Sequence, residues 1–161
     1  MTNIFEYAMQ MEKDGEDYYR QLAQQTNNDG MRNILTMLAD EEVKHYQAIE
    51  KMKTQQTQIV ESEILTDAKN VFAQIKESGE ILDFNISQAE LYTKARDIEK
   101  KSRDFYTEKA NEVTERYQKE LFLKLAVEEQ KHYVLLDNII EFISRPEQWL
   151  ENAEFFHLED Y

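Results

Sequence analysis

Residues 38–46 read LADEEVKHY and residues 125–133 read LAVEEQKHY, so a stretch of nine residues recurs with two changes. The copies are 87 positions apart, and the same offset places Glu12 on Glu99 without a gap. A repeat that extends over half of the chain indicates two copies of one structural unit. The fold is therefore expected to have an approximate twofold symmetry.

The repeated unit has the periodicity of a helical hairpin. Interior positions recur at alternating steps of three and four, which is the spacing of one helix face. A turn and N-cap cluster at residues 27–30 separates the first two helical segments. We therefore expect two antiparallel hairpins, at about residues 2–53 and 88–143. The four helical segments run over residues 5–22, 31–52, 92–106 and 122–143.

The two predicted hairpins are joined by a long connection, residues 54–87, with a helix of its own near residues 67–77. Such a connection can carry the chain across a bundle. The sequence thus predicts an all-α fold: a four-helix bundle over residues 1–145, built from two repeated hairpins with one long crossover. Residues 146–161 are expected to form a short C-terminal helix and an aromatic tail that packs on the bundle or on a partner subunit.

The composition agrees with an all-α chain and argues against several function classes. Three glycines and one proline among 161 residues are too few for the turns of a many-stranded sheet. A net charge of −14 disfavours nucleic-acid binding, and the lack of cysteine excludes disulfides, thiolate zinc sites and iron–sulfur clusters. No apolar run approaches the ~20 residues of a membrane span, and no basic-then-apolar leader begins the sequence. We therefore expect a cytoplasmic protein with no membrane partner.

Six polar residues occupy positions that face the interior of the predicted bundle. Ionised carboxylates are almost never buried unless they are paired or bound to metal. In each hairpin the two glutamates are 30 residues apart and nearly equidistant from the turn. At ~1.5 Å per residue both lie about 22 Å from that turn, at one level, and each Glu-x-x-His pair shares one helix face. The six residues are Glu12, Glu42, His45, Glu99, Glu129 and His132.

This set is suited to two divalent metal ions. Four carboxylates carry four negative charges, which two divalent cations balance. Mixed oxygen and imidazole ligation favours iron, manganese or zinc over calcium or magnesium. One alternative is a solvated acidic face, which is common in a chain of this charge. Another is a purely structural bundle, in which Glu42→Ala and Glu129→Ala would be neutral or stabilising because each removes a buried unpaired charge.

The two Glu-x-x-His copies, each with an upstream glutamate, make the chain resemble the rubrerythrins, a branch of the ferritin-like di-iron carboxylate proteins. Residues 12–19, EKDGEDYY, and residues 40–45, DEEVKH, carry the resemblance in the first hairpin. It extends over about residues 2–143. The expected fold is therefore the ferritin-like four-helix bundle, and the expected cofactor is two iron ions, with manganese or zinc as alternatives.

The resemblance also implies a role for each matching residue. The two carboxylates that would bridge the metals are Glu42 and Glu129. The capping ligands would be Glu12 with His45 for one ion and Glu99 with His132 for the other. A tyrosine two turns beyond each capping glutamate would hydrogen-bond a ligand carboxylate, and these residues are Tyr19 and Tyr106. No catalytic residue beyond the metal ligands is implied.

The implied activity is that of a peroxidase-type or ferroxidase-type oxidoreductase, in which hydrogen peroxide or dioxygen oxidises the di-iron site. A homodimer is expected by the same analogy. The sequence lacks the four cysteines of the rubredoxin domain found in many rubrerythrins, so an external electron donor such as a rubredoxin-like protein is expected. Ser102 stands where many relatives carry an additional glutamate, which leaves a symmetric six-ligand site. The alternative function is a ferritin-like metal-binding, carrier or storage protein without turnover.

Other acidic residues near the predicted site have less specific patterns. Glu16, Glu41 and Glu128 fall off the interior stripe and are predicted to be surface charges. Asp17 and Asp104 match across the repeat. They could orient the histidines or pair with lysines.

Overall fold

The structure is a computed structural model, and it describes residues 3–55, 57–79, 84 and 86–151. Every regular element in these ranges is a helix, which confirms the predicted all-α class. The helices are α1 (Ile4–Gln24), α2 (Asp29–Met52), α3 (Ile64–Ser78), α4 (Ile86–Glu112), α5 (Arg116–Ser144) and α6 (Pro146–Glu151).

Local capping interactions fix where several helices begin and end. The side chain of Asn3 accepts the backbone N–H of Phe5 at 2.8 Å, and that of Asn28 accepts the N–H of Met31 at 2.9 Å. Each satisfies a donor that the first turn of a helix leaves unpaired. Gly79 ends α3 with a φ of 65°, a left-handed conformation that suits glycine. The Asn28 cap therefore fixes where α2 begins after the turn from α1, and Gly79 fixes where α3 ends.

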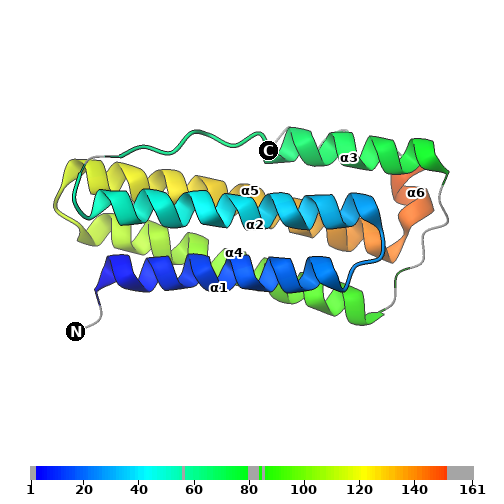
Figure 1. The fold of residues 1–161 in the computed structure, drawn as a ribbon, viewed down its shortest axis with the longest axis horizontal. Helices are drawn as coiled ribbons and strands as arrows, with labels where there is room; N and C mark the ends of the chain where they lie inside the picture. The colour runs from blue at the N-terminus through cyan, green and yellow to red at the C-terminus, as the bar shows by residue number, and fades with distance from the viewer. Residues whose placement is uncertain (1–2, 56, 80–83, 85, 152–161) are drawn as a thin grey trace.

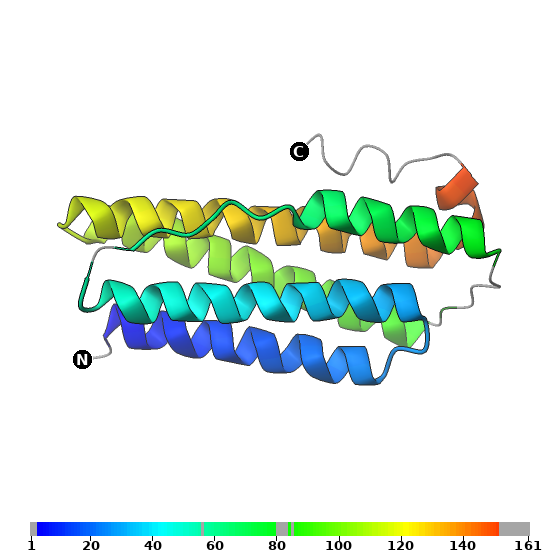
Figure 2. The ribbon, with the colours of Figure 1, turned by 45° about the horizontal axis from the view of Figure 1, so that its top comes forward.

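The main body is a bundle of two antiparallel hairpins, α1 with α2 and α4 with α5 (Figure 1). After α2 the chain runs back along the bundle as an extended segment and then enters α3, which packs against α2 and α5 (Figure 2). This is the predicted four-helix bundle with one long crossover. The helix expected near residues 67–77 is α3.

The apolar core lies in two clusters on either side of a polar layer. One cluster, at the end covered by α3 and α6, includes Leu38, Phe72 and Phe142. The other, at the opposite end, includes Ile49 and Phe122. Along each of the four long helices, the buried glutamates and histidines lie between members of these two clusters. The polar layer is thus enclosed by apolar packing at both ends.

The C-terminal part begins with α6, whose Trp149 is fully buried. The Trp149 ring lies 4.7 Å from that of Phe72 and 5.4 Å from that of Phe142, measured between centroids. Residues 152–161, which hold the rest of the predicted tail, lie outside the described residues. In the part of the chain that the structure describes, no helix combines the length and apolar character needed to cross a bilayer.

Candidate metal centre

The six polar residues of the interior stripe meet in the middle of the bundle. Each is at most 3% exposed, although all can carry charge. The helices α1 and α4 contribute one glutamate each, and α2 and α5 contribute one Glu-x-x-His pair each. This burial contradicts the alternative of a solvated acidic face. The residues are Glu12, Glu42, His45, Glu99, Glu129 and His132.

The side chains form two groups of four that could each hold a metal ion. In each group, one possible ligand atom from every residue lies within 4.8 Å of the others. Glu42 and Glu129 belong to both groups. The arrangement therefore has two positions with two carboxylates between them. The first group is completed by Glu12 and His45, and the second by Glu99 and His132.

His45 faces one carboxylate from each hairpin. Its Nδ1 atom lies 3.0 Å from Glu129 Oε1, on the second hairpin, and 3.5 Å from Glu12 Oε2, on its own hairpin. The ring is only 2% exposed. Its Nδ1 edge is therefore directed into the layer of carboxylates.

His132 repeats this arrangement from the other side. Its Nδ1 atom lies 3.3 Å from Glu42 Oε1, on the first hairpin, and 3.4 Å from Glu99 Oε1, on its own hairpin. The rings of His132 and His45 are nearly parallel, with centroids 5.7 Å apart and planes 9° apart. The internal symmetry seen in the sequence is thus present in the geometry of the cluster.

Two buried tyrosines connect the hairpins through the cluster. The Tyr106 hydroxyl donates to Glu12 Oε1 at 2.5 Å, and the Tyr19 hydroxyl donates to Glu99 Oε1. Each tyrosine therefore contacts the glutamate of the opposite hairpin rather than that of its own helix. Burial and the nearby carboxylates hold the pKa of both phenols well above the ordinary value. Both hydroxyls consequently stay protonated and act as donors.

The four carboxyl groups of the layer form two pairs whose pKa values shift in opposite directions. Burial, reinforced by repulsion from neighbouring carboxylates, raises the pKa of Glu42 and Glu129 well above the usual value. Burial also opposes ionisation of Glu12 and Glu99, but hydrogen bonds and the neighbouring histidines outweigh it. The pKa of Glu12 is lowered, and that of Glu99 falls to about 2. Without a cation, protons are therefore held mainly by the two carboxyls shared between the groups.

Several buried atoms of the cluster have no hydrogen-bond partner. An unsatisfied buried polar group costs about 1–3 kcal/mol, and more when it is charged. Divalent cations bound among these atoms would satisfy them and replace the protons on the shared carboxyls. The donor set of carboxylate oxygens and imidazole nitrogens fits iron, manganese or zinc. The unpartnered atoms are Glu12 Oε2, Glu42 Oε1, Glu99 Oε2 and both ring nitrogens of His132.

Small residues lie at matched positions beside the cluster. A Cβ built on Gly15 would lie 3.5 Å from Cδ and Oε2 of Glu42, which is ordinary contact. The repeat places Ser102 at the corresponding position of α4, where it is 9% exposed. Neither residue adds a carboxylate. The acidic groups of the layer are therefore the four repeated glutamates.

The prediction that Glu128 is a surface charge was wrong. Glu128 is 3% exposed, and its Oε1 atom accepts the backbone N–H of Ser62 at 3.1 Å and the ammonium of Lys131 at 3.2 Å. Lys131 also donates to Glu61 at 3.1 Å. Together these contacts fasten the extended crossover to α5. The helical pattern gives no signal for this burial, because the covering segment is far away in the sequence.

The matched aspartates pair with cationic side chains of their own helices. Asp17 lies 3.3 Å from Lys13, and Asp104 lies 3.2 Å from Arg103. Glu16, also predicted as a surface charge, pairs with Arg20 at 2.7 Å and is partly exposed. These residues surround the centre without contacting its histidines in the interactions that the structure shows.

Comparison with known proteins agrees with the fold and with the buried cluster. The sequence model of the rubrerythrin family matches residues 3–141, and the chain therefore belongs to this family of ferritin-like carboxylate proteins. A solved structure with a similar fold is "Hypothetical Protein Pfu-1136390-001 From Pyrococcus furiosus", which is 20% identical over 87% of each chain with a TM-score of 0.60. No curated protein matches the sequence.

Proposed function

We propose that this protein is a non-haem di-iron oxidoreductase of the rubrerythrin type that reduces hydrogen peroxide, or dioxygen, to water. The observation that carries the proposal is the pair of buried four-residue groups that share Glu42 and Glu129. These two carboxylates would bridge the metals. Glu12 with His45 and Glu99 with His132 would cap one ion each.

Two iron ions held there would supply the two electrons that convert hydrogen peroxide and two protons into two water molecules. The protein's own residues position the ligands. The phenols of Tyr106 and Tyr19 hold the capping carboxylates Glu12 and Glu99 from the opposite hairpin. The apolar clusters at both ends of the layer limit water around the charged groups. The ligand set therefore needs little rearrangement when a metal binds.

The proposed electron donor is a rubredoxin-like protein, since the 161 residues of this sequence hold no cysteine that could bind a rubredoxin-type iron. The family also suggests a homodimer, which sedimentation would test. The second candidate function is metal carriage or storage without turnover. Ser102 favours it, because this position lacks the additional glutamate of many relatives.

The test is anaerobic loading with ferrous iron, followed by hydrogen peroxide or dioxygen in parallel. The proposal predicts rapid growth of ferric absorbance in the near-ultraviolet, faster with peroxide, and repeated peroxide consumption when a reductant is supplied. A single oxidation without turnover would support the carrier or storage function. Consumption no faster than that by free iron at the same concentration would contradict the enzymatic proposal.

A further inference from the structure

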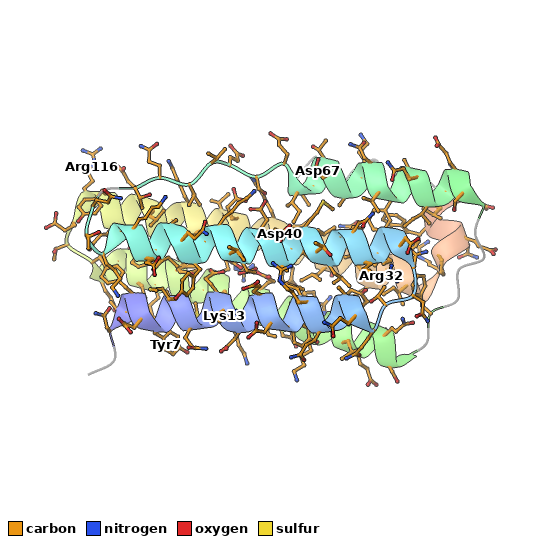
Figure 3. The ribbon with its side chains drawn as sticks, in the orientation of Figure 1. Tyr7, Lys13, Arg32, Asp40, Asp67 and Arg116 are labelled. Atoms are coloured by element: carbon orange, nitrogen blue, oxygen red, sulfur yellow. The ribbon has the colours of Figure 1, made fainter. Side chains whose placement is uncertain are left out.

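A groove between α1 and α2 reaches the carboxylates of the candidate metal centre. It encloses about 390 Å³, and its lining includes the buried Glu12 and Glu42. The unpartnered oxygen of each, Glu12 Oε2 and Glu42 Oε1, lies within 3.5 Å of a histidine Nδ1 atom, on the inner side of the layer. Farther out, the groove is lined by Glu16, Glu50 and the exposed Lys13, which Figure 3 shows on α1. The groove therefore connects an acidic mouth to two proposed ligands.

The second hairpin provides an internal comparison, because the repeat assigns every groove residue a counterpart. The offset of 87 pairs Tyr46 with Tyr133, so the aromatic residue is retained. It pairs Glu16 with Arg103, so an acid on one hairpin corresponds to a guanidinium on the other. The repeat is thus preserved at the six proposed ligands and broken at the mouth of the groove.

Two arginines cover the corresponding surface between α4 and α5. Arg103 lies 5.6 Å from the ring centroid of Tyr133 and donates to Gln130 at 2.6 Å. Arg96 lies 5.9 Å from the same centroid and donates to Asp137 at 2.7 Å. Both guanidinium groups therefore bridge the two helices across the tyrosine ring. A cation that approached this side would meet two guanidinium groups, each of which also pairs with an aspartate.

The difference in charge between the two mouths follows directly from the sequence. The three charged residues of the α1–α2 mouth carry one net negative charge, whereas their counterparts carry one net positive charge. An excess of negative charge at a cleft raises the local concentration of cations, and here the excess among the lining residues is one charge, with Glu16 also paired to Arg20 at 2.7 Å. The mouth residues are Lys13, Glu16 and Glu50, and their counterparts are Lys100, Arg103 and Asp137.

We propose that the α1–α2 groove is the route by which divalent cations reach the centre, an inference that rests on the proposed metal site. A second cavity, of about 470 Å³, lies between α2 and the crossover, and its lining includes His45 and Glu63, with four acidic and two basic side chains in all. That cavity also attracts cations, so the choice between the two routes rests on the ligand carboxylates rather than on charge. None of the four clustered glutamates lines that cavity. Two of the proposed ligand carboxylates, those of Glu12 and Glu42, line the α1–α2 groove, so a hydrated cation in the groove can exchange water for them.

The test measures the rate of Co²⁺ binding to the metal-free full chain by stopped-flow absorbance under anaerobic conditions. Glu50→Gln removes one charge from the groove mouth, and Glu63→Gln removes one from the rival cavity as a matched control. At low ionic strength, Glu50→Gln is expected to slow binding about threefold and Glu63→Gln to leave it unchanged. The difference should shrink as salt is added. Equal rates in both variants, or a slower rate in Glu63→Gln alone, would overturn the inference.

An exchange between the hairpins tests the same route independently. Glu16→Arg gives the α1–α2 mouth the side chain of its counterpart and is expected to slow binding about tenfold or more. Adding Arg103→Glu in the same chain removes a guanidinium from the α4–α5 side and is expected to restore much of the lost rate. Circular dichroism checks that both variants are folded. A folded Glu16→Arg protein that loads at the wild-type rate would contradict the proposed route.

The final stoichiometry separates this inference from the proposed function. Two Co²⁺ ions per chain at equilibrium in wild type and in Glu50→Gln, with unchanged rates, would refute the route and leave the centre intact. Failure of wild type to bind Co²⁺ or Fe²⁺ at all would refute the centre, and the route would fall with it.

Discussion

The hydrogen bond from Tyr106 to Glu12 should couple stability to metal affinity. Tyr106→Phe removes only a hydroxyl, from a ring that is fully buried, and leaves Glu12 Oε1 without the donor that now lies 2.5 Å away. A hydrogen bond to a charged group contributes about 1.5–3 kcal/mol. For a chain of this length, 1 kcal/mol corresponds to roughly 2–4 °C in Tm. The metal-free variant should therefore melt about 3–12 °C below wild type.

The same substitution should weaken metal binding, because Glu12 loses the group that orients it. Loss of such a supporting contact typically reduces metal affinity about 10–100-fold. Tyr92→Phe is the matched control: Tyr92 is also buried, at 2% exposure, but its phenol lies near Thr26 and Tyr18 rather than near a clustered glutamate. It should lower Tm without changing metal affinity. Differential scanning calorimetry and competitive chelator titration measure the two effects. Unchanged metal affinity in Tyr106→Phe would refute this reasoning.

Three further predictions concern the layer and its surroundings. The pKa values of Glu42 and Glu129 are raised well above 4.5 in the folded state, so the metal-free protein should lose stability as pH rises above 4.5. Urea unfolding measures this loss, and Glu42→Gln should reduce it. The lowered pKa values of Glu12 and Glu99 affect stability only at more acidic pH. The raised pKa of His132 removes stability as pH rises, as the raised pKa values of Glu42 and Glu129 do. Gly15→Ala should raise the unfolding free energy by up to about 1 kcal/mol with metal content unchanged, because its Cβ only touches Glu42; a loss of metal would show that the space is needed. Glu128→Ala should cost about 1–3 kcal/mol and speed proteolysis near Ser62, whereas Glu120→Ala on the exposed face of α5 should do neither.

Much of this structure could be predicted because its determinants are periodic. The offset of 87 residues revealed two copies of one hairpin. Glu12 and Glu42 lie at similar distances on either side of the loop that joins their helices, which placed them at the same level of the bundle. Burial of a charge-rich stripe follows from its position on the apolar face of each helix. The fold class and the meeting of the six side chains could therefore be inferred before any contact was known. Their role as metal ligands stays a prediction.

Contacts between distant segments could not be predicted in the same way. The burial of Glu128 depends on where residues 57–63 lie, and an irregular segment has no periodicity from which to place it. The exchange of partners, with Tyr106 on Glu12 and Tyr19 on Glu99, depends on how the two hairpins are rotated against each other. The groove between α1 and α2 depends on which side chains bridge each helix pair. In each case the contact joins residues that share no periodic pattern in the sequence.

Metal loading decides whether the buried layer is a two-metal site. The most direct measurement is an anaerobic titration of the metal-free protein with Fe²⁺, followed by metal analysis and melting, for wild type and Glu42→Ala. A two-metal site predicts a break at two ions per wild-type chain with a rise in Tm, and a loss of both in Glu42→Ala. A wild-type chain that binds no metal, together with a Glu42→Ala variant that is more stable than wild type, would show that the layer is purely structural and contradict the account.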